Sequence, residues 1–280
     1  MESGIELMAG SGGTLVPLGL ALLGTGAAAG LLAGLLGVGG GIVIVPALYH
    51  LAPHLAMAPD VRMHVAVGTS LATIILTSLA SIRAHARRGA VDTDLLRGWG
   101  PPLLLGVGGG ALAAPAINAA TLGLIFACTA LGVAFYMAFV PRTLQLAATP
   151  PVGWRRGVLS AGVGALSTLM GIGGGTVMVP LQVLCGVPIH RAVGTAAAFG
   201  LLIGVPGSVG FLFSGLDVAG RPPFSLGYLS LPGLALIAPT SLLMAPVGAR
   251  LAHALPPAGL RRAFALFLLL TALRMFLGTA

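Results

Sequence analysis

The chain has 280 residues, of which 57% are hydrophobic and only 7% are charged. Its mean hydropathy is +1.04. Soluble domains carry roughly 25% charged residues, so this composition excludes a cytosolic enzyme, a nucleic-acid-binding protein, a disordered chain and a disulfide-rich secreted scaffold. The composition is that of a polytopic membrane protein, most of whose surface contacts the lipid bilayer.

The net charge of +8 does not indicate a nucleic-acid partner. The arginines lie in short loops between apolar segments, which is the distribution that orients a membrane protein. Cys128 and Cys185 lie in apolar stretches without a CxxC motif, so we expect no disulfide, no metal site and no cofactor. The first residues carry Glu2 and Glu6 and no basic residue, which predicts that no cleavable signal peptide is present.

The predicted elements are apolar runs separated by polar residues. In the first half these runs cover residues 14–36, 42–51, 64–82, 99–117 and 119–140. In the second half they cover residues 157–170, 176–187, 190–213, 226–249 and 260–279. The long runs reach the roughly 18 residues needed to cross a bilayer. The short runs beside the sequences GVGGG and GIGGG suit helices of half that length.

The two halves of the chain resemble each other at three places in the same order. GVGGGIVIVP at 37–46 matches GIGGGTVMVP at 171–180, and HVAVGTS at 64–70 matches HRAVGTA at 190–196. A weaker match joins the sequences LAAP and LMAP further on. Paired repeats with interrupted helices are common in transporters. We therefore predict one membrane domain over 1–280, with repeat one at about 14–141 and repeat two at about 157–279.

The arginines indicate how the two repeats are related. If each glycine-broken segment crossed the membrane once, nine arginines would lie on one side and five on the other. If each broken segment turns back, the division is eleven to three, which agrees better with the positive-inside rule. The predicted fold is thus all-α, with two inverted repeats. Each has a glycine-broken element, re-entrant or a pair of short helices, plus three transmembrane helices, and both termini lie outside.

The glycine-rich sequences are candidates for an anion-binding site. Glycine permits backbone geometries closed to other residues, so the N–H groups can face a cavity, and a helix N-terminus adds about half a positive charge. The candidate substrate-binding residues are Gly39, Gly40, Gly41, Thr69, Ser70, Gly173, Gly174, Gly175, Thr176 and Thr195. The alternatives are close helix packing for the glycines and helix capping for the hydroxyls. We expect no catalytic residues.

The acidic residues all lie in termini or loops. They are Glu2, Glu6, Asp60, Asp92, Asp94 and Asp217. Carboxylates inside membrane spans commonly mark proton or sodium relays, and none is predicted here. An anion that leaves the cell is driven by the inside-negative potential and needs no coupling ion. This distribution therefore favours outward anion transport.

The segments LLAGLLGVGGGIVIVPAL and STLMGIGGGTVMVPL, with AVGTS and AVGTA, resemble the TauE/SafE family of sulfite exporters. The resemblance runs from about residue 27 to 277. It implies a bacterial inner-membrane permease for a small anionic substrate such as sulfite or sulfoacetate, with the six glycines, Thr69 and Thr195 at the site. Ala196 stands opposite Ser70, so the two half-sites are not chemically equal.

Several alternatives stay open at this point. An anion channel and an importer of thiosulfate or other small anions share the predicted site. A cation transporter would want buried carboxylates, which are absent from the predicted spans. An intramembrane enzyme would need a histidine or carboxylate at the depth of Ser167 or Ser208, and no predicted span supplies one. Assembly into a homo-oligomer is compatible with the sequence.

Overall fold

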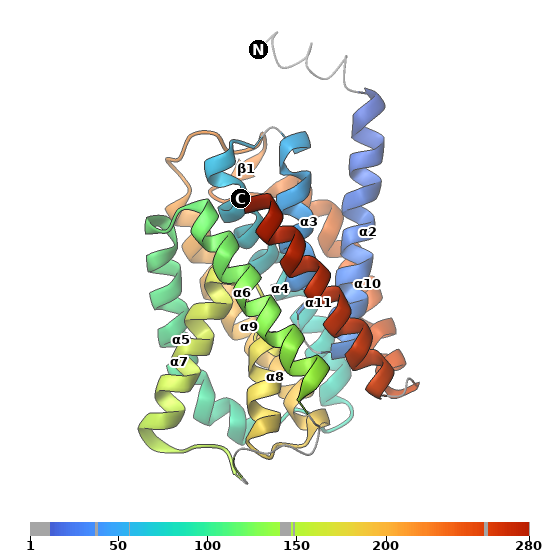
Figure 1. The fold of residues 1–280 in the computed structure, drawn as a ribbon, viewed down its shortest axis with the longest axis vertical. Helices are drawn as coiled ribbons and strands as arrows, with labels where there is room; N and C mark the ends of the chain where they lie inside the picture. The colour runs from blue at the N-terminus through green and yellow to red at the C-terminus, as the bar shows by residue number, and fades with distance from the viewer. Residues whose placement is uncertain are drawn as a thin grey trace.

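The computed structural model describes residues 12–36, 39–55, 57–140, 147, 149–254 and 257–279. Glu2 and Glu6, together with Gly37 and Val38 of the first glycine-rich sequence, lie outside these residues. The described part is a bundle of helices with one short hairpin (Figure 1).

The helices follow the predicted apolar runs closely. The first half contains α2 (Gly12–Leu36), α3 (Gly41–Leu51), α4 (Arg62–Ala86), α5 (Thr93–Ala113) and α6 (Ala119–Phe139). Short 3-10 turns lie at Ala52–Leu55, Pro59–Val61 and Ala114–Ala116. The second half contains α7 (Gly153–Met170), α8 (Gly175–Leu184), α9 (Ile189–Ser214), α10 (Leu231–Ala254) and α11 (Pro257–Thr279).

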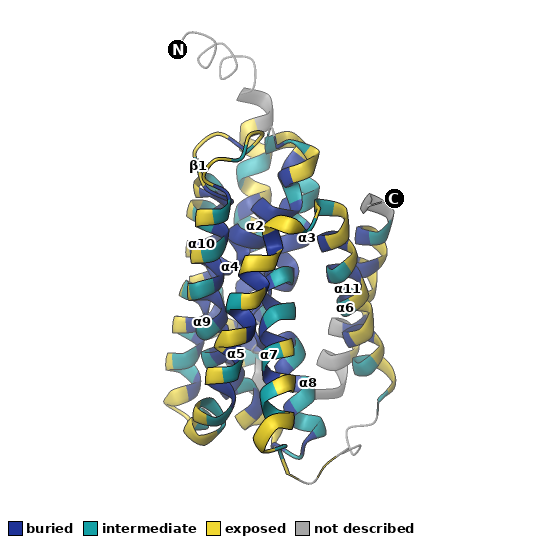
Figure 2. Ribbon diagram, turned by 90° about the vertical axis from the view of Figure 1, so that its left-hand side faces the viewer, coloured by how far each residue is buried: buried dark blue, intermediate teal, exposed yellow. Residues whose placement is uncertain are grey.

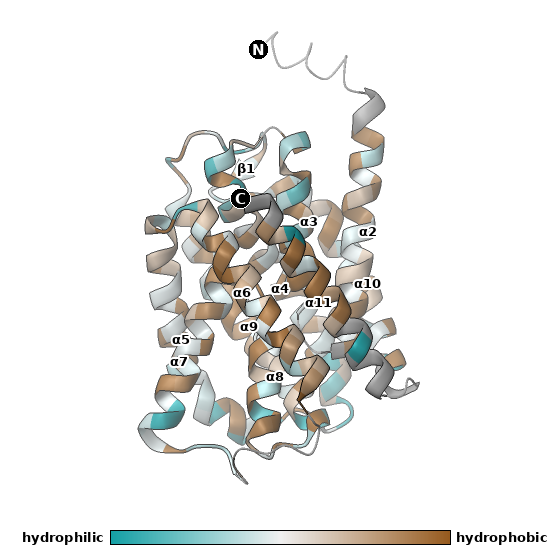
Figure 3. Cartoon of the chain, viewed as in Figure 1, coloured by the Kyte–Doolittle hydropathy of each residue, from teal (hydrophilic) through white to brown (hydrophobic). Residues whose placement is uncertain are grey.

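Five of the described helical segments are long and apolar enough to cross a membrane. They are Leu15–Leu35, Pro59–Ala86, Ala119–Phe139, Ile189–Ser214 and Leu231–Leu251. Shorter apolar segments lie at Gly41–Leu55, Gly175–Leu184 and Ala265–Phe276. The hydrophobic colouring of Figure 3 extends along the outward faces of α6 and α11, which is where a lipid-facing helix places its apolar side chains.

The helices pair in the same way in the two halves. α2 packs against α10 and α5 packs against α7, while α4 packs against α9 and α6 against α11. α3 contacts α4, and α8 contacts α9. α4 and α9 occupy the interior, and α4 is mostly buried (Figure 2). Each helix of α2–α6 has a counterpart in α7–α11 in chain order. When every helix is replaced by its counterpart, the same set of contacts results.

Polar side chains cap the starts of α5 and α6, and of these two starts only that of α5 differs from the predicted apolar run. The predicted run at 99–117 is helix α5 over Thr93–Ala113, because the Asp92 carboxylate accepts hydrogen bonds from the backbone N–H groups of Asp94 (3.0 Å) and Leu95 (3.1 Å) and starts the helix earlier. The Asn118 side chain accepts from the Thr121 N–H at 2.8 Å and starts α6.

The prediction of helix from residue 226 onward was wrong. Residues 225–230 form an antiparallel hairpin, with β1 at Ser225–Leu226 and β2 at Leu229–Ser230, and α10 begins only at Leu231. The turn contains Gly227 with a φ of 58°, a left-handed conformation that glycine adopts without steric cost. The part of the chain that the structure describes is therefore helical, with this hairpin as its one sheet.

Candidate functional site

The glycine-rich sequences form two sharp breaks between antiparallel helix pairs. α2 leads to Gly39 and Gly40, and α3 turns back from Gly41. α7 ends at Met170, and α8 turns back from Gly175. Gly39, Gly40 and Gly171 have φ values of 75°, 79° and 65°. These values lie in the left-handed region, which explains why the breaks need glycine. We call Gly39–Gly41 and Gly171–Gly175 the two tips.

The structure brings the two tips into direct contact. A Cβ atom added to Gly39 would lie 3.1 Å from the Cα of Gly173. A Cβ atom on Gly41 would clash with the carbonyl oxygen of Gly171 and lie 2.9 Å from the Cα of Ile172. The backbones of two segments about 130 residues apart therefore touch, and any side chain at these positions would separate them.

The tips are closed in this structure, where the sequence led us to expect N–H groups facing a cavity. Gly40 and Gly41 are buried, as are Gly173, Gly174 and Gly175, and Gly39 is half-buried. A Cβ atom on Gly40 would lie 2.9 Å from the carbonyl oxygen of Ala29 in α2. In this conformation the glycines serve close backbone packing.

Ser70 links α4 to the opposite tip. Its hydroxyl donates a hydrogen bond to the carbonyl oxygen of Gly171 at 2.6 Å, and the side chain is fully buried. Ala196, at the matching place in the second repeat, has no hydroxyl. The contact that the Ser70 hydroxyl makes is therefore specific to the first half.

Thr69 and Thr195 hold helix starts rather than the tips. The Thr69 hydroxyl oxygen accepts a hydrogen bond from the backbone N–H of Ser230 at 2.9 Å, just before α10. The Thr195 hydroxyl oxygen accepts from the backbone N–H of Asp92 at 2.9 Å, just before α5. Both threonines are fully buried. Each long interior helix thus fixes the beginning of a helix from the other half.

Thr176 belongs to a set of buried polar side chains whose polar atoms have no hydrogen-bond partner among the described residues. Besides Thr176 the set includes Ser78 and Ser81 of α4, Ser167 of α7 and Gln182 of α8. All five are at least 95% buried. Unpaired buried donors are costly, so each of these groups indicates a position at which a polar ligand or water would supply the missing hydrogen bond.

Sequence reasoning did not select Ser78 and Ser81 for the site. Their spacing of three residues inside an otherwise apolar run was the signal that could have found them. They lie in the half of α4 that runs from the tips toward the arginine-bearing loop (Figure 1). The matching positions in α9 are Gly204 and Gly207, so the second half has no hydroxyl at the places that match Ser78 and Ser81.

The charges lie away from the tips. Among the described residues no aspartate or glutamate is buried. The Asp92 carboxylate lies 3.7 Å from the Arg191 guanidinium, and that of Asp94 lies 3.9 Å from Arg97 in an exposed pair. The described residues contain no cluster of histidine, cysteine or acidic side chains that could hold a metal. Cys128 and Cys185 are free thiols.

Comparison with known proteins identifies relatives over nearly the whole chain. A probable membrane transporter protein of Haemophilus influenzae is 36% identical over 255 residues, which are 90% of this chain and 96% of the relative. The probable membrane transporter protein YunE of Bacillus subtilis is 33% identical and covers 68% of this chain and 77% of its own. MJ0441 of Methanocaldococcus jannaschii, also described as a probable membrane transporter protein, is 26% identical over 88% of this chain and 90% of its own.

No solved structure matches the chain at a significant level. The family described as sulfite exporter TauE/SafE matches residues 22–275, a range that includes both tips and the paired long helices. The chain is therefore a multi-pass membrane transporter protein that belongs to the TauE/SafE sulfite exporter family.

Proposed function

We propose that this transporter moves small sulfur-containing oxyanions, such as sulfite, sulfoacetate or a related sulfonate, out of the cytoplasm. One observation carries the proposal. α3 and α8 both begin at the contacting tips and run in opposite directions from them (Figure 1). The positive ends of two helix dipoles therefore meet at one point, and no buried carboxylate among the described residues compensates them. Such a point attracts an anion.

The substrate would bind between the tips when they separate. In that state the backbone N–H groups near Gly39–Gly41 and Gly173–Gly175 would become free to donate, and the buried hydroxyls of Ser167 and Thr176 have no other described partner. Ser70 would lose Gly171 as its acceptor and could also reach the substrate. These groups would donate hydrogen bonds to oxyanion oxygens without contributing a formal charge.

Opening and closing would occur by motion of one repeat against the other. We take the repeats as residues 14–141 and 157–279, because exchanging them maps the α2–α10 contact onto the α7–α5 contact. We take them to be related by inversion, because α3 and α8 run in opposite directions from the tips. Inverted repeats allow the same site to face either side in turn. The closed tips of this structure would be the intermediate in which the site faces neither side.

The orientation in the membrane decides which end of the protein faces the cytoplasm. The start of α2 and the end of α11 lie toward one end of the bundle, and the end of α4, which leads into the arginine-rich loop, lies toward the other (Figure 1). By the positive-inside rule the arginine-bearing end is cytoplasmic in a bacterial inner membrane, and both termini are outside. The inside-negative potential then drives an anion outward with about 2.3 kcal/mol per charge per 100 mV.

Counterflow in proteoliposomes tests this function. Vesicles containing the purified protein are loaded with unlabelled sulfite, sulfoacetate, thiosulfate or a cation control, and uptake of the labelled solute is followed. We expect accumulation of labelled sulfite or a sulfonate against its gradient. Flux without counterflow would identify a channel, and counterflow of the cation alone would contradict the anion assignment.

A matched pair of glycine substitutions tests the place of the site. Gly39→Ala introduces a methyl group 3.1 Å from the Cα of Gly173 and places alanine at a positive φ, so we expect transport about five- to thirtyfold slower from a cost of roughly 1–2 kcal/mol. Gly108→Ala is the control, because nothing lies within 4 Å of its new Cβ. Full transport by a folded Gly39→Ala protein would show that the tips do not lie on the substrate path.

A further inference from the structure

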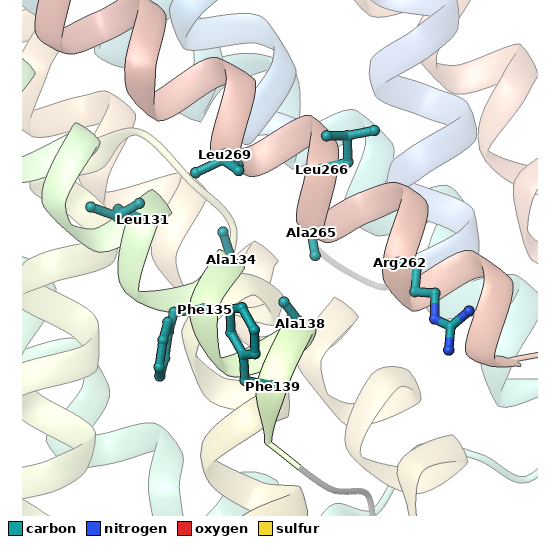
Figure 4. A pocket seen from close by; sticks show the side chains of 9 residues that line it. All are labelled: Leu131, Ala134, Phe135, Ala138, Phe139, Arg262, Ala265, Leu266 and Leu269. Carbon is teal, nitrogen blue, oxygen red and sulfur yellow. The ribbon is translucent and has the colours of Figure 1, made fainter.

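A groove of about 300 Å³ lies between α6 and α11 on the outer face of the bundle, away from the tips (Figure 4). Alanines form its floor, and Ala134 and Ala265 are more than 90% buried. Phe135 and Leu266, both more than half exposed, form its sides. The groove exists because small residues on both helices leave room that the larger neighbours do not fill.

The dimensions of the groove match one acyl chain in one leaflet. On α6 its lining runs from Leu131 to Phe139, which is about 12 Å at roughly 1.5 Å per residue. The hydrocarbon core of a single leaflet is about 15 Å thick, half of the roughly 30 Å bilayer core. An acyl chain lying along α6 would therefore be covered over most of its depth.

The groove has one positively charged side chain in its lining. Arg262, near the start of α11, is exposed and belongs to the lining (Figure 4). No acidic residue lines the groove, and neither of the two ion pairs among the described residues includes Arg262. Arg262 lies near the start of α11, the end of that helix that faces the arginine-bearing end of the bundle and the head groups of that leaflet (Figure 1). A guanidinium at this place pairs well with a phosphate.

We propose that this groove is a binding site for an anionic phospholipid, with an acyl chain between α6 and α11 and the head-group phosphate at Arg262. The apolar lining selects the chain, and the single unpaired cation selects the anionic head group. Basic residues beside grooves between transmembrane helices bind acidic lipids in this way. The site is separate from the tips, so this proposal does not depend on the transported substrate.

Lipid retention measured by native mass spectrometry tests the proposal. The full chain is purified from vesicles containing equal amounts of phosphatidylglycerol and phosphatidylcholine. We expect preferential retention of phosphatidylglycerol by about fivefold, which is the ratio given by roughly 1 kcal/mol per arginine near an anionic lipid surface. Arg262→Gln should remove this preference. Arg250→Gln is the matched control, because Arg250 is also exposed but does not line the groove.

Filling the groove tests the acyl-chain half of the proposal. Ala138→Leu should reduce retention of both lipids, whereas Ala113→Leu, an exposed alanine on α5 outside the groove, should not. Equal retention of the two lipids by the unsubstituted protein, or an unchanged preference in Arg262→Gln, would overturn the proposal. Efficient cross-linking of two copies through Ala138→Cys would also overturn it, by assigning the groove to a second copy of the chain.

Discussion

Ile74 is the residue that fills the space beside the tips. Its Cγ2 atom lies 3.5 Å from the position of a Cβ atom on Gly39, 3.7 Å from that on Gly200 and 3.5 Å from that on Gly204. The side chain is fully buried. Gly200 is also the residue that matches Ile74 in the second repeat. The first half thus places the large side chain of Ile74 beside the tips, and the second half has glycine at the matching position, which leaves space for that side chain.

Shortening Ile74 should change substrate selection. Ile74→Ala opens space next to Gly39, so we expect the ratio of sulfoacetate to sulfite transport to rise by about tenfold, the lower end of what one added or removed methylene gives in a substrate pocket. Competition counterflow measures this ratio. Leu76→Ala, on an exposed part of the same helix, is the control. A lower melting temperature with an unchanged ratio would show that Ile74 only packs the core.

The hydrogen bond of the Ser70 hydroxyl should contribute to the stability of the closed conformation. Ser70→Ala removes the donor to the Gly171 carbonyl, so we expect a loss of about 1 kcal/mol in the free energy of unfolding. The change should appear as a lower melting temperature in detergent. Thr121→Ala, which removes an exposed hydroxyl, should leave the melting temperature unchanged. If Ser70→Ala also left it unchanged, the hydrogen bond would contribute nothing to the closed state.

At the scale of elements, the two interior helices hold the opposite halves together by the same means. The Thr69–Ser230 bond joins α4 to the start of α10, and the Thr195–Asp92 bond joins α9 to the start of α5. Asp92 also caps α5 and pairs with Arg191. The start of α5 is therefore held by three interactions of one residue.

Removing these hydroxyls should loosen the held helix starts locally. In Thr69→Val we expect hydrogen exchange at the Ser230 amide to speed up by about fivefold, which corresponds to roughly 1 kcal/mol for one lost hydrogen bond. The Asp92 amide should be unaffected. Thr195→Val should show the reverse pattern, so each variant is the control for the other. Unchanged exchange at both amides would mean that packing alone holds these helix starts.

The sequence was informative where one physical signal dominates. Apolar runs located the ten α-helices of the described residues, because burial in lipid requires continuous hydrophobic segments, and paired GxGGG sequences located the breaks. The hairpin at 225–230 was missed, because Leu226 and Leu229 are continuous with the apolar run that follows and were assigned to its helix. The contact between the tips could not be predicted either. Whether glycine N–H groups face a cavity or another backbone depends on long-range packing, here of Gly41 against Gly171.

At the scale of the whole molecule, the chain has one arginine-rich end. The loops after α4 and before α7 contain Arg87, Arg88, Arg155 and Arg156, whereas the opposite end carries Arg62 and Arg221. Because K/R bias in short loops sets the orientation of membrane proteins, the end with the termini is expected outside the cell. In this orientation, the export that we propose carries the anion from the arginine-rich end to the opposite end, which is the direction that the inside-negative potential favours.

Cysteine labelling in intact cells measures this orientation. In a background without Cys128 and Cys185, Arg87→Cys places an exposed thiol at the arginine-rich end, and Asp217→Cys places one at the other end. A membrane-impermeant maleimide should label Asp217→Cys in intact cells but should label Arg87→Cys only after the cells are opened. The two variants control for each other's expression and reactivity. Labelling of Arg87→Cys alone in intact cells would show that the arginine-rich end lies outside, and it would contradict the orientation that we predict.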